Sequence, residues 1–111
     1  MTLLSNVNVG GTDFGYSGTV PVGSCDTPAG TQMKAATFDD RFDLRTSKLI
    51  AVKFTYANTY GDGSSVYPML TVDGNSYPIR VASNGGYAQS GAWSDSALVL
   101  FLFDGISMYI I

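Results

Sequence analysis

The chain has 111 residues and a formal net charge of −3, and it contains no histidine and no glutamate. Histidine is the commonest general base and the commonest metal ligand, so the usual catalytic and metal-binding arrangements are excluded. A weakly acidic chain does not attract nucleic acid, and no segment approaches the ~20 apolar residues of a membrane span. We therefore expect a protein that is not an enzyme, holds no cofactor or metal, binds no nucleic acid and does not insert into a membrane.

The composition favours strands joined by tight turns. Thirteen glycines, together with Asp, Asn, Ser and Thr in place of helix-forming glutamate, are typical of turns and strand edges. A chain of this length buries about 65% of its unfolded surface, which is enough for one small core. The single cysteine, Cys25, cannot form an intrachain disulfide, and we expect it to be a small buried side chain. The N-terminus lacks the basic region and apolar run of a signal peptide.

Residues 1–32 form a glycine-rich segment that we expect to be extended and irregular. Short strands are predicted near Val7–Val9 and Thr19–Val22. Leu3 and Leu4 have no apolar partner nearby in the sequence, so this segment is expected to lead in from an upstream neighbour or to take part in subunit contacts. The remaining residues, 33–111, carry a regular strand pattern and are predicted to form the core.

The core pattern predicts strands at residues 33–38, 49–56, 66–72, 77–82, 97–103 and 107–111. From Ile50 to Tyr56 apolar and outward-facing residues alternate, as in a half-buried antiparallel strand. Hairpins are predicted at Asp73-Gly74 and Asp104-Gly105, because Asp-Gly pairs favour the tight turns that join antiparallel strands. Together these features predict an all-β fold, a single antiparallel β-sandwich or flattened barrel.

Two prolines, one strand that is apolar on both faces and one charged loop depart from a simple alternating sheet. Pro68 and Pro78 lie within predicted strands, and because proline donates no ladder hydrogen bond we expect an edge or a bulge at both points. Residues 97–103 are apolar on both faces, which is typical of a strand that is central in a sandwich or covered by a second subunit. In the charged loop between the first two core strands, Phe42 and Leu44 are expected to tuck inward.

Carboxylate chemistry is the main enzymatic alternative. Asp39, Asp40 and Asp43 are candidates for glycoside hydrolysis, but adjacent aspartates at a strand end point to opposite sides, which is poor geometry for carboxylates that flank one bond. Residues 60–65 combine one carboxylate with hydroxyls and carbonyls, but they lack the regular acidic spacing of a calcium loop. These aspartates are better explained as turn residues whose carboxylates face solvent than as catalytic groups or calcium ligands.

Aromatic side chains in two polar loops are the candidate ligand contacts. Tyr87 and Trp93 lie in the glycine-rich loop 83–96, and Tyr60 follows Asn58 in a second turn-rich loop. Tyrosine and tryptophan stack on sugar rings or anchor protein interfaces, because the ring supplies rigid apolar area. We therefore predict a ligand-binding patch of Trp93, Tyr87, Tyr60 and Asn58. The alternative for Trp93 is that it folds back and plugs the end of the sandwich.

The order of several short motifs resembles a known family. These motifs are Ser24-Cys-Asp-Thr-Pro-Ala-Gly-Thr31, Lys34, Ala51-Val-Lys-Phe-Thr-Tyr-Ala-Asn-Thr59, Leu70-Thr-Val-Asp-Gly74, Pro78-Ile79, Trp93 and Phe103-Asp-Gly105. In this order, from about Phe14 to the C-terminus, they resemble a β-module of tail-fibre, baseplate and other minor structural proteins of tailed bacteriophages. The chain departs from that pattern where Phe103 replaces a tyrosine and Met108 a tryptophan, and it has a longer loop at residues 61–65.

The resemblance implies a structural protein of the phage particle, made in the bacterial cytoplasm and located in the virion. It implies a homo-oligomer, most often a trimer, that also contacts other virion proteins as a fibre segment, an anchor or a receptor-binding tip. The expected function is therefore non-enzymatic assembly with a contribution to host attachment. The alternative is a carbohydrate-binding domain that recognises bacterial surface glycans through the aromatic loops.

Overall fold

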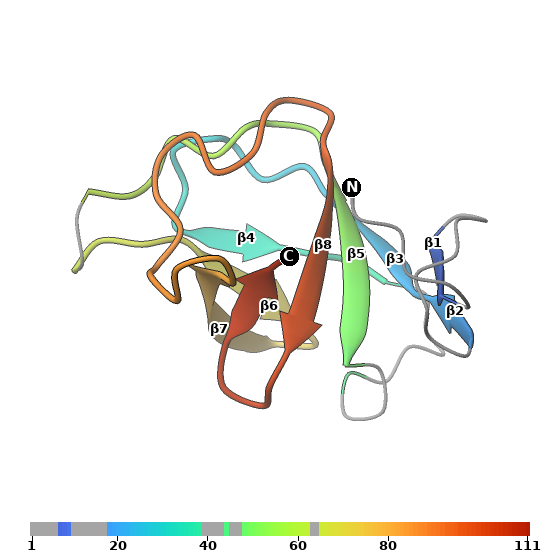
Figure 1. Ribbon diagram of the computed structural model, residues 1–111. Coiled ribbons are helices and arrows are strands. Elements are labelled where there is room, and N and C mark those ends of the chain that lie inside the picture. Colours follow the sequence, from blue (N-terminus) through green and yellow to red (C-terminus); the bar gives the residue numbers. More distant parts are fainter. Residues whose placement is uncertain (1–6, 10–17, 39–43, 45–47, 63–64) are drawn as a thin grey trace.

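The computed structural model shows a single seven-stranded sheet that curls until it is nearly closed into a barrel (Figure 1). It describes residues 7–9, 18–38, 44, 48–62 and 65–111. The strands are β1 (Val7–Val9), β2 (Gly18–Val20), β3 (Val22–Cys25), β4 (Met33–Ala35), β5 (Leu49–Phe54), β6 (Met69–Val72), β7 (Asn75–Val81), β8 (Leu98–Phe103) and β9 (Met108–Ile110). The sheet has the order β3-β5-β8-β9-β7-β6-β4, and β1 and β2 form a separate pair. In this part of the chain no helix is long and apolar enough to span a membrane.

The two ends of the sheet meet at one pair of residues. Ser24 in β3 donates its N–H to the carbonyl of Thr37 at 2.9 Å, and the Thr37 N–H donates back to the Ser24 carbonyl at 2.8 Å. Thr37 lies just beyond β4, the last strand in the order, so this antiparallel bridge joins the last strand to the first. An inner face and an outer face follow from this closure.

The strand directions differ from the prediction. The all-β class is confirmed, but the purely antiparallel sandwich is wrong, because the sheet is mixed. β3 runs parallel to β5, β4 to β6 and β7 to β9, while the other neighbours are antiparallel. Alternation in a sequence shows which residues share a face and carries no information on direction. The long connections between these partners, residues 26–48, 36–68 and 82–107, give the room that a parallel crossover needs.

Both predicted hairpins are confirmed. β6 and β7 are antiparallel and are joined through Asp73 and Gly74, whose φ angles of 52° and 80° are those of a type I′ turn. β8 and β9 are joined through Asp104 and Gly105, and the carboxylate of Asp104 accepts the N–H groups of Ile106 and Ser107 at 2.8 and 2.7 Å. The bonds from the Ser107 and then the Ile106 backbone lower the pKa of the Asp104 carboxyl.

The two prolines lie where a missing N–H interrupts little. Pro68 immediately precedes β6, and its carbonyl accepts the Ile79 N–H at 3.1 Å. Pro78 lies within β7 opposite Met69, one residue before the point where β9 begins to pair with that strand. At Pro78, therefore, β7 is paired on one side only, as expected of proline in a sheet.

The core combines inward residues of β3, β5, β6, β7, β8 and β9 with three residues from connecting segments. Its buried members are Cys25, Leu44, Ile50, Val52, Phe54, Leu70, Val72, Ile79, Ala88, Trp93, Val99, Phe101 and Met108. Leu44 is buried as predicted, whereas Phe42 lies outside the described residues. Cys25 is also buried as predicted, with 2% of its surface exposed. β3, which supplies Cys25, belongs to the barrel although it falls within the lead-in segment 1–32.

Candidate interaction surface

The outward face of β8 is apolar, which is unusual for the exterior of a small barrel. Val99 and Phe101 point into the core, while Leu98, Leu100 and Leu102 point outward. Leu100 is buried, but Leu98 and Leu102 keep 47% and 43% of their surface exposed. The sequence predicted that this strand is central or covered by a second subunit. Its central position between β5 and β9 is confirmed, and its cover by a second subunit stays a prediction.

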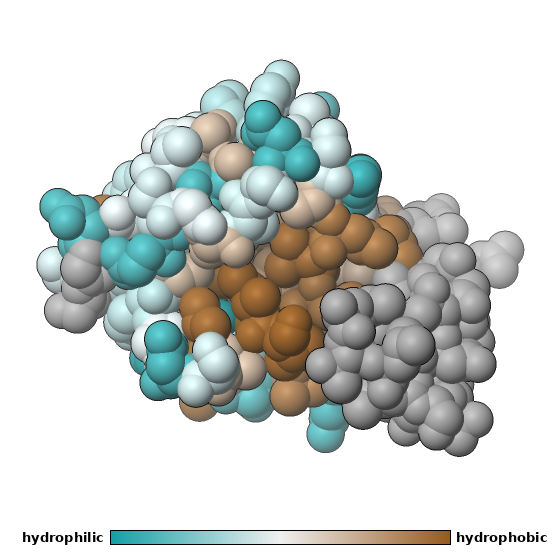
Figure 2. Space-filling model, turned by 45° about the horizontal axis from the view of Figure 1, so that its top comes forward, coloured by the Kyte–Doolittle hydropathy of each residue, from teal (hydrophilic) through white to brown (hydrophobic). Residues whose placement is uncertain are grey.

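This apolar surface continues onto the neighbouring strands. Leu100 lies opposite Ala51 and Leu102 opposite Leu49, both on β5. Outside the barrel, a buried cluster is formed by Val20 of β2, Leu49, Ala51 and Leu100. At its margins lie the exposed side chains of Val22 on β3 and Ile111 after β9. We call these residues the outer apolar face: Val22, Leu98, Leu102 and Ile111, which are exposed, and Val20, Leu49, Ala51 and Leu100, which are buried between them and β2. Figure 2 shows hydrophobic side chains gathered in the centre of the view.

Trp93, predicted to contact a ligand, lies at the end of the barrel core. Its ring stacks on Phe54 with centroids 4.3 Å apart, and only 6% of its surface is exposed. Its indole Nε1 donates to the Tyr56 carbonyl at 3.1 Å. Both the apolar ring and the polar N–H are therefore satisfied within the fold, which corresponds to the alternative in which Trp93 plugs the end of the core.

Asn58 is fully buried and joins two loops. Its side-chain nitrogen donates to the carbonyls of Tyr60 at 2.7 Å and Gln89 at 3.0 Å, and its side-chain oxygen accepts the Tyr60 N–H at 3.1 Å. The Asn58 carbonyl accepts the Gly91 N–H at 2.7 Å. Both the nitrogen and the oxygen of the Asn58 amide are therefore bonded within the chain, and they hold the two loops together. This is a structural role.

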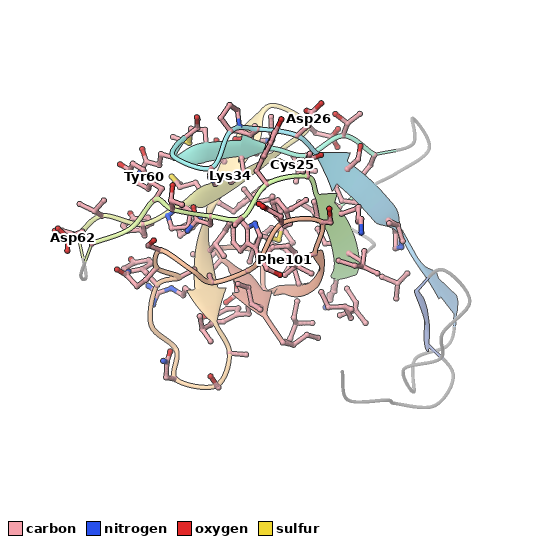
Figure 3. The ribbon with its side chains drawn as sticks, turned by 90° about the horizontal axis from the view of Figure 1, so that it is seen from above. Cys25, Asp26, Lys34, Tyr60, Asp62 and Phe101 are labelled. Carbon is pink, nitrogen blue, oxygen red and sulfur yellow. The ribbon has the colours of Figure 1, made fainter. Side chains whose placement is uncertain are left out.

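Tyr87 and Tyr60, the other predicted ligand contacts, are half-buried. Tyr87 stacks on Tyr67 with centroids 3.9 Å apart and planes 8° apart, and the Arg80 guanidinium carbon lies 4.1 Å from the same ring centre. Two groups this close cannot share one face, so Tyr67 and Arg80 cover opposite faces of the Tyr87 ring. Arg80 is held in place by its bond to the Gly85 carbonyl at 2.8 Å. Tyr60 lies on a loop that projects from the barrel (Figure 3).

Lys34 is a buried residue whose role the sequence did not reveal. It is 1% exposed, and its Nζ donates to the carbonyls of Ala29 at 2.8 Å and Pro28 at 3.4 Å. The Ala29 carbonyl also accepts the Thr59 N–H at 3.0 Å, so the lysine helps to join the loop after β3 to the loop after β5. Burial lowers the pKa of Lys34, and the opposing effect of the Cys25 thiol is smaller. Cys25 and Lys34 come from β3 and β4, the strands at the two ends of the sheet (Figure 3).

The candidate carboxylates of the sequence are only partly within the described residues. Asp62 is the acidic residue of the loop at 60–65, and Gly63 and Ser64 of that loop lie outside the described residues. Among the described side chains, no three Asp or Cys residues gather closely enough to hold a metal ion. Asp39, Asp40 and Asp43, the candidates for glycoside hydrolysis, lie outside the described residues.

No family model, curated protein or solved structure matches the chain.

Replacing Trp93 tests its position in the core. Trp93→Ala should lower the free energy of unfolding by about 3–5 kcal/mol, because it removes a large stacked ring from the core. Trp93→Phe keeps a ring against Phe54 and loses the bond to the Tyr56 carbonyl, so the expected loss from the missing bond is about 1 kcal/mol. Urea unfolding followed by circular dichroism measures both. If both variants lost the same small amount of unfolding free energy, the buried position of the indole would be contradicted.

Lys34 should make stability depend on pH. Its pKa in the folded protein is below the ordinary value of 10.5, so between these two values the unfolded chain binds a proton that the folded chain does not. The free energy of unfolding should therefore rise with pH through this window, relative to that of Lys34→Met. Groups common to both proteins cancel in the difference.

The measurement is urea unfolding of wild type and Lys34→Met from neutral pH to about 10.5. Lys48→Met, which removes the same charge from an exposed side chain, is the control. If the free energy of unfolding of wild type, relative to that of Lys34→Met, stayed constant or fell as the pH rises, the burial of the ammonium group would be contradicted.

Proposed function

We propose that this chain is a non-enzymatic structural module of a tailed-bacteriophage virion, and that it assembles with itself through the outer apolar face. The observation that carries the proposal is the outward leucine row of β8. Leu98 and Leu102 remain almost half-exposed on a barrel whose interior is already filled by the inward row of the same strand.

A second copy is the partner that this face favours. The face is built from aliphatic side chains, and Lys53, which lies opposite Leu98, turns its ammonium group to the Ser96 carbonyl at 2.5 Å. Homo-oligomer interfaces are more apolar than the rest of a protein surface and are poor in charged side chains at their centre. Closed symmetry is the commonest form of such assemblies. The resemblance to phage modules implies a trimer that also contacts other virion proteins, and we propose that state.

The placement in a virion is supported by the motif order that resembles phage tail-fibre and baseplate modules. Several residues of those motifs hold this barrel together. Asp73-Gly74 forms the turn between β6 and β7. Lys34 bonds the Ala29 carbonyl inside the barrel, and Trp93 stacks on Phe54 at the end of its core. A scaffold of this kind, with its polar side chains used for turns and loop contacts, suits a building block of a particle.

Substitution of the leucine row tests the assembly. Leu98→Lys and Leu102→Lys should each weaken association at least tenfold, because an unpaired ammonium would be buried in an apolar contact. Ser83→Lys, which adds the same charge to an exposed turn, is the control and should leave association unchanged. Light scattering over a range of protein concentrations gives the molar mass. A wild-type mass of 11.8 kDa, that of one chain, at every concentration would contradict self-assembly.

Carbohydrate binding is a second candidate, with the edge of the Tyr87 ring and the Tyr60 side chain as the proposed contacts. Because both faces of the Tyr87 ring are covered by Tyr67 and Arg80, this ring offers its edge and hydroxyl to a ligand. Tyr60 on the projecting loop is the other candidate contact. The rigid stack would hold such a hydroxyl in place at little entropic cost.

Titration with purified bacterial surface polysaccharide tests this candidate. Tyr87→Phe keeps the stacked ring and removes the hydroxyl, and Tyr60→Ala removes the other contact, so each should weaken binding by about tenfold. Ser83→Ala is the control for a change on the same glycine-rich loop. Unchanged affinity in both tyrosine variants, or no binding by wild type, would remove this function from the aromatic loops.

A further inference from the structure

Arg80 lies on the outward face of β7, between two tyrosines. Its neighbours in the strand, Ile79 and Val81, pack in or against the core, so the arginine side chain points outward. Its partner on β9 is Tyr109, and its partner on the other side is Tyr87, in an isolated antiparallel bridge. Both cross-strand neighbours of the arginine are therefore aromatic, and the guanidinium group lies over the ring of Tyr87.

Two contacts fix the guanidinium group of Arg80. Its carbon lies 4.1 Å from the centre of the Tyr87 ring, and its Nη1 donates to the Gly85 carbonyl at 2.8 Å. The Tyr87 ring is itself stacked on Tyr67. An arginine held in this way loses little conformational freedom when it binds a ligand, because its orientation is already selected in the free protein.

The bond from Nη1 leaves one edge of the guanidinium group open. Arginine carries several N–H donors in a planar fork. In the described part of the chain, the edge formed by Nε and Nη2 of Arg80 has no hydrogen-bond partner. The parallel N–H groups of such an edge match the paired oxygens of a carboxylate, and this bidentate geometry is more specific than the attraction of a point charge.

The same arrangement excludes the stacking of a sugar on Tyr87. A pyranose ring that stacks needs a free aromatic face, and both faces of this ring are covered, by Tyr67 and by Arg80. Recognition at this point of the surface must therefore come from charge and hydrogen bonding. The Nε–Nη2 edge of Arg80 supplies both, which favours an acidic sugar over a neutral one.

We propose that the Nε–Nη2 edge of Arg80 binds the carboxylate of an acidic polysaccharide built from uronic acids. This inference rests on the proposed carbohydrate binding and names its substrate class. Within the chain, Asp104 is already bonded by the side chain of Tyr109 and by the backbone N–H groups of Ile106 and Ser107. A polymer presents its carboxylate many times, which raises the apparent affinity of a weak single contact.

Titration with a uronic acid tests the contact directly. Sodium galacturonate is added to isotope-labelled protein, and the Nε–H signal of Arg80 is followed by nuclear magnetic resonance. Galactose is the neutral probe, and sodium chloride at the same ionic strength is the control for salt. Galacturonate should shift the signal in a saturable way, whereas galactose and chloride should not. A signal that stays in place, or that moves as far with chloride as with galacturonate, would overturn the inference.

Substitution of Arg80 tests the fork geometry. Binding of polygalacturonate and of its carboxyl-reduced, neutral form is measured by calorimetry at about 0.15 M salt, which screens the repulsion between the acidic chain and the polymer. Arg80→Gln should weaken binding of the acidic polymer by about tenfold, and Arg80→Lys, which keeps the charge without the fork, should recover little. Lys48→Gln removes one positive charge from another exposed side chain and should leave binding unchanged.

The remaining outcomes separate this inference from the proposed carbohydrate binding. Circular dichroism shows that each variant is folded. Full recovery by Arg80→Lys, or equal binding of the acidic and neutral polymers, would overturn the carboxylate contact. If bacterial surface polysaccharide bound through Tyr60 and Tyr87 without any response to galacturonate, carbohydrate binding would stand and its acidic class would be overturned. If galacturonate shifted the Arg80 signal but no polysaccharide bound, the contact would stand and the carbohydrate function would be overturned.

Discussion

Closure of the sheet is the constraint on which the rest of the structure depends. The two backbone hydrogen bonds between Ser24 and Thr37 join the first strand of the order to the last. A closed sheet has an interior that accepts only one row of side chains from each strand, and it has few unpaired edges through which other chains could add. The second row of every strand faces outward, to solvent or to a segment that covers the barrel, as Val20 of β2 covers Ala51 and Leu100.

Hydrogen bonds to residues 56–60 close one end of the barrel. Trp93 donates to the Tyr56 carbonyl, Thr59 donates to the Ala29 carbonyl that Lys34 also bonds, and the buried amide of Asn58 reaches Gln89. An indole, an ammonium group and an amide are the kinds of side chain expected at a ligand site. Here each is paired within the chain, which explains why polar residues at a barrel end are an ambiguous sign of binding.

The sequence predicted the features that depend on local chemistry and missed those that depend on closure. The Asp73-Gly74 turn was predictable because φ values above zero at both positions suit this residue pair. β3 was harder to recognise, since Gly23 leaves a gap in the apolar pattern. The structure shows why: a Cβ at Gly23 would lie 2.7 Å from the Phe38 ring, which occupies that space. The burial of Lys34 was not predictable either, because its carbonyl partners come from a loop folded back over the barrel.

The central claim is that Leu98 and Leu102, the exposed members of the outward row of β8, are covered by a second copy of the chain. Isotope-filtered nuclear Overhauser spectra of mixed labelled and unlabelled protein test it most directly, because they detect only contacts between copies. We expect intermolecular cross-peaks at the methyl groups of Leu98 and Leu102. Intermolecular cross-peaks confined to the opposite side of the sheet order, at Thr71 and Ser76 on β6 and β7, or none at all, would contradict the account.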